Sequence, residues 1–360
     1  MPDKVPALTH KQMLVAKKDY EHAASVMKLV YVNDQLPGIE RKKKGKTYQY
    51  LAGNKIVKDE ATLDRIKKLV IPPAWTNVWI CAKANGHIQC TGFDVRKRKQ
   101  YRYHSLWNLL REETKFHHLY EFGLVLPELR KKLARDLAQP ELTQSKVLAA
   151  VLSVMEQTYI RVGSNAYEKE YGSYGLTTLK DKHTSINGSK IDFCFVGKKG
   201  VEQKITLQNK RLARIVKECR DVPGKDLFQY YDSAGNRKPI DGTMVNNYIK
   251  EATGNSFSAK DFRTWAGSLH ALKALHDIGA GDTEALIKKN VVAALDIVSE
   301  KLGNTRTVCK KYYVHPGILK LYEEKKLQRY LGPFNKQTKA SNTAALSKEE
   351  EVLLRILKKV

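Results

Sequence analysis

Basic side chains and tyrosines lie in four segments of the sequence, near predicted helix ends and in a predicted hairpin turn. Arg161 follows a long apolar helix and precedes Gly163, and Lys198 lies at the tip of a predicted hairpin. Arg263 lies in the first turns of a helix, and segment 303–316 contains two adjacent tyrosines. Guanidinium and ammonium groups bind phosphate. Each residue is also ordinary when taken singly, since basic side chains at helix ends are usually solvated or ion-paired. Spacing alone therefore indicates nucleic-acid binding and no more.

Other catalytic chemistries lack their characteristic residues. The ten histidines are scattered, and no group of His, Cys and carboxylate residues has the spacing of metal ligands. The sequence contains neither a GxxxxGK[ST] phosphate loop nor a GxSxG elbow. We therefore expect an activity that needs no metal, no nucleotide and no other cofactor.

The charge balance points to a polyanionic partner. The 360 residues include 64 Lys and Arg against 38 Asp and Glu, a formal net charge of +26. Such a field attracts polyanions, and nucleic acid is favoured because each neutralised phosphate releases counterions. A protein of the membrane surface would instead need a basic amphipathic helix or a lipidation signal, and neither is found.

The cysteines and the N-terminus indicate a reducing compartment. The number of cysteines is odd and none forms a CxxC pair, which is typical of reduced thiols. They are Cys81, Cys90, Cys194, Cys219 and Cys309. The first residues lack the apolar core of a secretory signal, and no stretch is long enough to span a bilayer. We expect a cytoplasmic protein that acts on nucleoid or viral DNA.

The first 105 residues have the pattern of a small, strand-rich domain. A helix is predicted at 8–32, and a basic run at 41–46 leads into short strands. A helix at about 60–69 ends at Pro72 and Pro73, because proline lacks an N–H and clashes with the preceding turn. The predicted strands are 47–51, 78–82 and 88–90.

A second domain, 106–332, has mainly helical periodicity. Two domains are also what a chain of this length is expected to form. Segments 190–197 and 201–207 form a predicted β-hairpin around Lys198-Lys199-Gly200. Ser258 and Asp261 fit a capping box. The predicted helices are 106–118, 129–138, 147–159, 209–219, 242–252, 258–277 and 283–301. The remaining 333–360 is a polar, basic tail, expected to be flexible, with a short helix at 347–358.

In their order and spacing, these segments resemble the type IB DNA topoisomerases, especially the compact bacterial and poxvirus enzymes. The resemblance runs from about Ile71 to Pro316. Any one motif is weak, but four in the same order leave little room for chance. The most specific pieces are Ile-Arg-Val-Gly (160–163), Tyr-Gly-Leu-Thr-Thr-Leu-Lys-Asp-Lys-His (174–183), Phe-Val-Gly-Lys (195–198), Lys-Asp-Phe-Arg-Thr-Trp (260–265), Leu-Gly-Asn-Thr (302–305) and Tyr-Val-His-Pro (313–316).

The resemblance implies an α+β fold with a strand-rich N-terminal domain and a larger, mostly helical catalytic domain that contains a β-hairpin. The catalytic domain would be similar to that of tyrosine recombinases, and the two domains would close around duplex DNA as a C-shaped clamp. The implied activity is transient cleavage of one strand through a 3′-phosphotyrosyl bond, strand rotation and religation. Both signs of supercoil would relax without ATP or metal, and the enzyme would act as a monomer.

The resemblance also assigns catalytic roles. Tyr313 would be the nucleophile, and a phenol suits this step because its pKa of about 10 makes it easier to activate than an alcohol. Arg161 and Arg263 would hold the non-bridging oxygens, where negative charge gathers in the transition state. Lys198 would give a proton to the departing 5′ oxygen. Asn304 would hydrogen-bond a non-bridging oxygen.

Asn304 differs from the residue found in part of the family, and the adjacent Tyr312 and Tyr313 leave a choice of nucleophile. Poxvirus and nuclear members resemble each other in having His where this chain has Asn304, whereas bacterial members look like this chain. An amide keeps the hydrogen-bond donor but cannot become a cation. Tyr312 is adjacent to Tyr313, and on a helix the two point about 100° apart. Tyr313 is preferred because it precedes Val-His-Pro, as in the family pattern.

Further residues are expected to touch DNA outside the chemistry. Segment 92–104 mixes cations with aromatic residues and is similar to a part of the family's N-terminal domain that contacts DNA near the cleavage site. A run of charge is also typical of a solvated face, and this alternative stays open. The expected contacts are Gln100, Tyr101, Tyr103, Arg96, Arg98 and Tyr167.

Two alternatives to the topoisomerase remain. A site-specific tyrosine recombinase or integrase shares the nucleophile and the basic residues but exchanges strands as a tetramer. The N-terminal segment and Tyr-Gly-Leu-Thr-Thr-Leu-Lys favour the topoisomerase. A non-catalytic DNA-binding protein explains the charge of +26, but it does not need the aligned Arg, Lys, Arg, Asn and Tyr.

Overall fold

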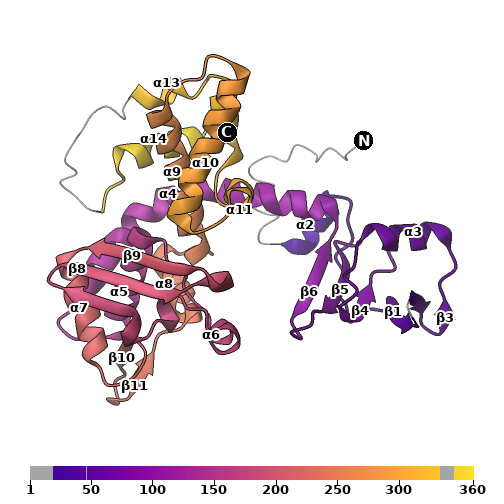
Figure 1. The fold of residues 1–360 in the computed structure, drawn as a ribbon, viewed down its shortest axis with the longest axis horizontal. Coiled ribbons are helices and arrows are strands. Elements are labelled where there is room, and N and C mark those ends of the chain that lie inside the picture. The colour runs from indigo at the N-terminus through magenta and orange to yellow at the C-terminus, as the bar shows by residue number, and fades with distance from the viewer. Residues whose placement is uncertain (1–18, 46, 333–343) are drawn as a thin grey trace. The chain divides into compact units, whose positions relative to one another are not determined.

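Our computed structural model of the protein describes residues 19–45, 47–332 and 344–360, without the side chains of 112–115 and 117. The chain divides into two compact units, Met1–His118 and Leu119–Val360 (Figure 1). The division falls within one long helix, α4 (Ser105–Leu137). The change of pattern near residue 105 therefore marks the beginning of a helix that both units share.

The first unit is built on a six-stranded antiparallel sheet with the strand order β3-β2-β1-β4-β5-β6. One face packs on helix α3 (Glu60–Lys68), where Ile39, Ile66 and Ile80 are buried. The strands predicted at 47–51, 78–82 and 88–90 and the helix at 60–69 are confirmed. The strands are β1 (Ile39–Lys44), β2 (Thr47–Ala52), β3 (Lys55–Ile56), β4 (Thr76–Ile80), β5 (Ile88–Phe93) and β6 (Lys99–Tyr103).

Residues 41–44 of the basic run belong to strand β1. Only Ile39 and Glu40 of β1 pair with β4, whereas all six residues of β1 pair with β2. Lys42, Lys43 and Lys44 therefore lie in a two-stranded extension, and all three are exposed. The unburied faces of such an extension tolerate lysine, which is why an apolar alternation was absent from the sequence.

The helix predicted at 8–32 is wrong at its C-terminal end. The helix in the described part of this segment is α2 (Tyr20–Val26), and residues 8–18 lie outside the described residues. After Met27, Lys28 adopts a left-handed conformation with φ of 56°, and Val30 pairs with Gly86. Helical spacing continued in the sequence, but the chain leaves the helix to reach the sheet.

A single helix replaces the two that were predicted at 106–118 and 129–138. Helix α4 continues through Gly123 and Pro127. Leu119, Phe122 and Leu126 are buried in the core of the second unit, so packing holds this stretch in a helix despite its weak helix formers. Gly123 lacks a side chain where Trp265 and Leu354 approach, because a Cβ there would lie 2.5 Å from the indole.

A three-stranded antiparallel sheet covers helix α5 (Gln144–Thr158) in the second unit (Figure 1). The predicted hairpin is confirmed as β8 (Lys190–Val196) and β9 (Glu202–Gln208). The sequence did not indicate the third strand, β7 (Thr184–Asn187), which has only four residues. Along β8, Ile191, Phe193 and Phe195 face the core and their neighbours face outward, which is the period of two expected of a half-buried strand.

Among the remaining helices of the second unit, α7 and α8 pack against α5, whereas α10, α12 and α14 (Lys348–Leu357) pack against α9. Those predicted at 147–159, 209–219, 242–252, 258–277 and 283–301 are confirmed as α5 and α7–α10. The Asp261 carboxylate accepts a hydrogen bond from the Ser258 backbone N–H at 2.8 Å, as expected of the capping box. The elements are α6 (Asn165–Tyr171), α7 (Lys210–Asp221), α8 (Gly242–Thr253), α9 (Ala259–Ile278), α10 (Glu284–Leu302), α11 (Arg306–Tyr312), α12 (Pro316–Glu323), α13 (Gln328–Leu331), β10 (Gln229–Tyr231) and β11 (Arg237–Pro239).

The C-terminal residues are not a flexible tail. Residues 333–343 lie outside the described residues, but helix α14 (Lys348–Leu357) is packed into the core of the second unit. Val352, Leu353, Ile356 and Leu357 are buried there. The short helix predicted at 347–358 is confirmed, whereas the expectation of a flexible segment is wrong for 344–360. The polar residues around this helix concealed its apolar face.

The five cysteines are free thiols, as expected. Within the residues that the structure describes, no helix has the length and apolar character needed to cross a membrane.

Candidate active site

The segment that carries Arg161 is held in place by the Tyr-Gly-Leu-Thr-Thr motif. Helix α5 ends at Thr158, and Tyr159 adopts a left-handed conformation that redirects the chain. The Leu176 N–H donates to the Arg161 carbonyl at 2.8 Å, and the Thr177 N–H donates to the next carbonyl at 2.7 Å. Gly175 permits this contact, because a Cβ there would lie 2.5 Å from the Arg161 carbonyl oxygen. The motif therefore supports the Arg161 backbone.

The Arg161 side chain reaches the turn that follows α10. Its Nη2 donates to the Gly303 carbonyl at 3.1 Å and to the Asn304 Oδ1 at 2.7 Å. Asn304 Nδ2 donates in turn to the Leu302 carbonyl at 3.2 Å, which fixes the amide. Burial lowers the pKa of Arg161, and the positive charge of Arg263 lowers it further. Two guanidinium groups are thus close enough to repel each other, an arrangement that favours an anion between them.

Arg263 is buried, with 5% of its surface exposed. Its Nη1 donates to the Tyr159 carbonyl, and its Nη2 donates to the Leu302 carbonyl at 2.7 Å. The guanidinium carbon lies 5.1 Å from the centre of the Tyr313 ring. Among the described residues, its Nε has no hydrogen-bond partner although it is buried. An unsatisfied buried donor of this kind calls for an explanation, and a bound anion is one.

Tyr313 follows the last residue of α11 and is tied to α9 through its backbone. Ser268 Oγ donates to the Tyr313 carbonyl at 3.2 Å and accepts from the His315 N–H at 3.0 Å. Gly267 lets the two segments touch, since a Cβ there would lie 2.6 Å from the Tyr313 carbonyl oxygen. Helix α9 therefore positions both Arg263 and Tyr313. The sequence reasoning missed Gly267 and Ser268, although a Gly-Ser pair inside an apolar helix is a signal of close packing.

We predict that Gly267→Ala slows the reaction at Tyr313 by roughly 10- to 100-fold, because a shift of about 1 Å in a reacting group can cost that much. The added methyl group must displace the Tyr313 backbone, even though alanine is the better helix former. The single-turnover rate would measure the effect. Gly332→Ala is the matched control, since no atom lies within 4 Å of its Cβ. Equal rates for Gly267→Ala and wild type would mean that this contact does not position the tyrosine.

The two adjacent tyrosines have different surroundings. Tyr313 is partly buried and faces Arg263, whereas Tyr312 is 40% exposed and its ring lies 5.5 Å from the Lys311 amine. Ser268 on α9 also holds the Tyr313 backbone. The contact with Arg263 distinguishes the surroundings of Tyr313 from those of Tyr312.

Lys198 stands at the exposed turn between β8 and β9, where Lys199 has a left-handed backbone with φ of 67°. Its amine lies 6.0 Å from the centre of the Tyr167 ring on α6. Helix α6 is held by Lys180, which forms ion pairs with Glu168 and with Asp226, both at 2.6 Å. Tyr167 is 41% exposed and is therefore available to a ligand.

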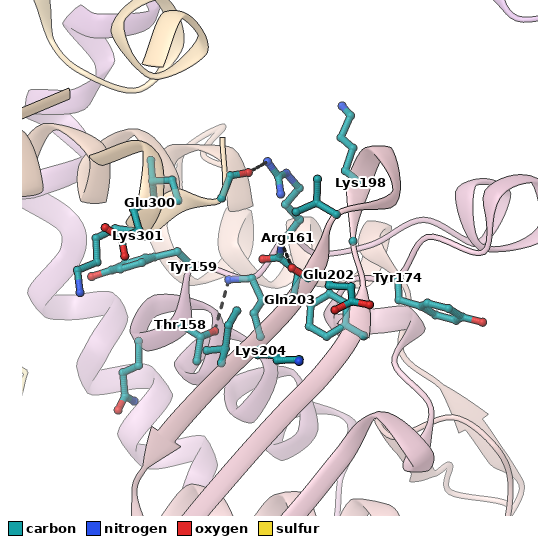
Figure 2. A pocket seen from close by; sticks show the side chains of 18 of the residues that line it. Thr158, Tyr159, Arg161, Tyr174, Lys198, Glu202, Gln203, Lys204, Glu300 and Lys301 are labelled. Atoms are coloured by element: carbon teal, nitrogen blue, oxygen red, sulfur yellow. Dashed lines mark hydrogen bonds between the residues drawn. The ribbon is translucent and has the colours of Figure 1, made fainter. Parts of the chain in front are cut away.

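One pocket of about 850 Å³ collects the predicted catalytic residues of the second unit. A neighbouring pocket of about 670 Å³ shares Arg161 and Lys198 with it (Figure 2). Figure 2 shows Lys198 extending from the hairpin, with Arg161 beneath it beside Gln203 of β9. The predicted residues that line the larger pocket are Arg161, Lys198, Arg263, Asn304, Tyr313 and Tyr167.

The other five predicted DNA contacts lie in the first unit, on β6 and the turn before it. Tyr101 and Tyr103 share a face of β6, and their rings stack with centres 5.8 Å apart. Asp94 forms an ion pair with Arg98 at 2.6 Å and accepts from the Gln100 amide at 3.0 Å. Arg96 is exposed in the turn. The described residues contain no group of three or more His, Cys, Asp or Glu that could hold a metal ion.

Comparisons with known proteins define the class. The model of the eukaryotic DNA topoisomerase I catalytic core matches residues 98–339, and that of the bacterial DNA topoisomerase IB N-terminal domain matches residues 47–94. The chain belongs to the type IB DNA topoisomerases, and its enzyme class is that of a DNA isomerase.

Individual relatives agree with the family models. The chain is 35% identical to DNA topoisomerase 1B of Acanthamoeba polyphaga mimivirus over 297 residues, which cover 80% of this chain and 88% of the relative. It is 23% identical to DNA topoisomerase 1B of Vaccinia virus (strain Copenhagen) over 279 residues, covering 76% and 85%. The Monkeypox virus DNA topoisomerase I has the same identity and coverage.

Proposed function

We propose that the protein relaxes supercoiled duplex DNA by cutting one strand with Tyr313, allowing the free end to rotate, and resealing the strand. The observation that carries the proposal is a pocket lined by Arg161, Lys198 and Tyr313, in which the Tyr313 ring lies 5.1 Å from the buried Arg263 guanidinium. Neither ATP nor a metal ion is required, because a phosphotyrosyl bond conserves the energy of the broken phosphodiester.

The Tyr313 hydroxyl releases its proton to water, and its oxygen forms a bond to phosphorus as the bond from phosphorus to the 5′ oxygen breaks. The product is a 3′-phosphotyrosyl bond and a free 5′-hydroxyl. Arg161 and Arg263 hold the non-bridging oxygens, where charge accumulates in the transition state. The unpartnered Nε of Arg263 supports this role, since a phosphate oxygen would satisfy it. Asn304, which is already bonded to Arg161, completes the contact.

Lys198 donates a proton to the departing 5′ oxygen. An alkoxide is a poor leaving group in water, and a positioned acid contributes about 10²–10⁴ in rate. The exposed hairpin tip suits this role, because the amine must enter a groove of the duplex while Arg161 remains on the rigid core. Religation reverses the same steps, with Lys198 removing the proton from the 5′-hydroxyl.

The first unit supplies contacts to DNA outside the chemistry. Gln100, Tyr101 and Tyr103 contact bases or phosphates, and Arg96 and Arg98 contact phosphates, as Tyr167 does in the second unit. We propose that the two units close around the duplex as a C-shaped clamp, with a tyrosine-recombinase-like catalytic unit. The protein would act as a monomer on cytoplasmic DNA.

Supercoiled plasmid without any special site, incubated in EDTA and without nucleotide, tests this function. We expect complete relaxation of both negatively and positively supercoiled plasmid, read on an agarose gel. Activity only on paired specific sites would instead identify a tyrosine recombinase. Binding without relaxation would identify a non-catalytic DNA-binding protein, and either result would contradict the proposal.

A further inference from the structure

Helix α14 lies beyond residue 339, where the match to the topoisomerase catalytic core ends. It nevertheless packs against α9, the helix that carries Arg263 (Figure 1). Its apolar face is buried in the main core of the second unit. The C-terminal Val360 also packs against Gly317, where an added Cβ would lie 2.6 Å from it. The C-terminus thus contacts the segment that follows Tyr313.

Glu350 is the polar centre of this packing, with 5% of its surface exposed. Both its oxygens accept from Arg130 on α4, at 2.7 and 2.9 Å. Its Oε1 also accepts from the Trp265 indole N–H on α9 at 3.1 Å. Its Oε2 accepts from the Ser347 N–H at 2.9 Å, which caps α14. A buried carboxylate with this many donors fixes the elements that carry them.

Arg130 extends the network to α5. Its Nε donates to Glu156 at 2.8 Å, three residues before Tyr159. The Tyr159 carbonyl is the group that accepts from Arg263 Nη1. Burial raises the pKa of the Tyr159 hydroxyl, and the negative charges of Glu156 and Glu350 raise it further.

We infer that Glu350 of α14 is a positioning residue for the two catalytic arginines. Through Trp265 it holds α9 two residues beyond Arg263, and through Arg130 and Glu156 it holds the end of α5 that leads to Arg161. The two paths meet at the hydrogen bond between Arg263 and Tyr159. The inference rests on the proposed function, because it assumes that Arg161 and Arg263 bind the reacting phosphate.

The test compares Glu350→Gln with Glu351→Gln, which removes the same charge from the adjacent, exposed residue. Enzyme in excess is mixed with plasmid and quenched with SDS over time, so that both the rate constant and the final fraction of nicked, protein-linked DNA are measured. We expect Glu350→Gln to approach the same final fraction about 10- to 100-fold more slowly, because misplaced arginines slow cleavage and religation alike. Glu351→Gln should match wild type.

The rate constant and the amplitude separate positioning from stability. If Glu350 only stabilised the fold, the remaining folded variant would react at the wild-type rate constant, with an equal or smaller final fraction, and this result would overturn the inference. Trp265→Phe is the second variant, since it removes the indole N–H and leaves the pair between Arg130 and Glu350. It too should slow the approach without lowering the amplitude, and a wild-type rate constant for it would count against the inference. A wild type that forms no covalent complex would instead refute the proposed function.

Discussion

Tyr313→Phe is expected to bind plasmid as tightly as wild type and to relax none of it. The substitution removes only the hydroxyl, so the ring still packs 5.1 Å from the Arg263 guanidinium and the backbone keeps its bond from Ser268. Without the oxygen nucleophile no phosphotyrosyl bond forms, and loss of a covalent nucleophile costs at least about 10⁴-fold in rate. Relaxation over a wide range of enzyme concentrations, with a filter-binding assay in parallel, measures both quantities.

Tyr312→Phe is the matched control for the nucleophile. The Tyr312 side chain is 40% exposed, and its ring lies beside the Lys311 amine, whereas the Tyr313 ring faces the buried Arg263 guanidinium. We expect this variant to retain most of the wild-type relaxation rate. An inactive Tyr312→Phe beside an active Tyr313→Phe would reverse the assignment.

Arg263→Lys should reduce the rate of cleavage by about 10²–10³-fold, the usual cost of removing one preorganised donor from a developing oxyanion. The wild-type guanidinium holds the Tyr159 and Leu302 carbonyls with two nitrogens while its Nε remains unpartnered within the described structure. The three N–H donors of a lysine ammonium sit on one nitrogen, so they cannot span both carbonyls and a phosphate as the planar guanidinium does. Single-turnover cleavage at saturating DNA measures this loss.

The same variant should also unfold more readily. A carbonyl left unpaired in this buried place costs about 1–3 kcal/mol, which a urea unfolding curve would detect. Arg214→Lys on the exposed face of α7 is the control, since its side chain is 68% exposed. A cleavage rate for Arg263→Lys equal to that of wild type would show that Arg263 only supports the fold.

Sequence periodicity predicted the helices and strands in which the order of apolar and polar residues matches the buried and exposed positions. Strand β8 alternates apolar and polar residues, and α7–α10 have apolar residues on one face, so both were located within a few residues. Strand β1 was missed because Lys42–Lys44 are exposed on a two-stranded extension. Helix α4 was divided because its continuity through Gly123 depends on Trp265 and Leu354, which are distant in the sequence.

The motifs predicted residues that the structure brings to one pocket, but not the contacts that hold them there. The motifs indicated Arg161, Arg263 and Tyr313 because their residue types and order are specific. Much of what holds them is backbone, such as the Tyr159 and Leu302 carbonyls that accept from Arg263, and a carbonyl has no signature in a sequence. The contribution of α14 was hidden for a related reason, since its partners lie on three other helices.

Mass analysis of the covalent adduct tests the central claim most directly. The enzyme is mixed with nicked or supercoiled plasmid, quenched with SDS, treated with nuclease and digested with protease, and the peptide that retains a nucleotide is sequenced. We predict a nucleotide attached through its 3′ phosphate to Tyr313, in the peptide that begins after Lys311. The absence of any adduct, or an adduct on another residue such as Tyr312, would contradict the account.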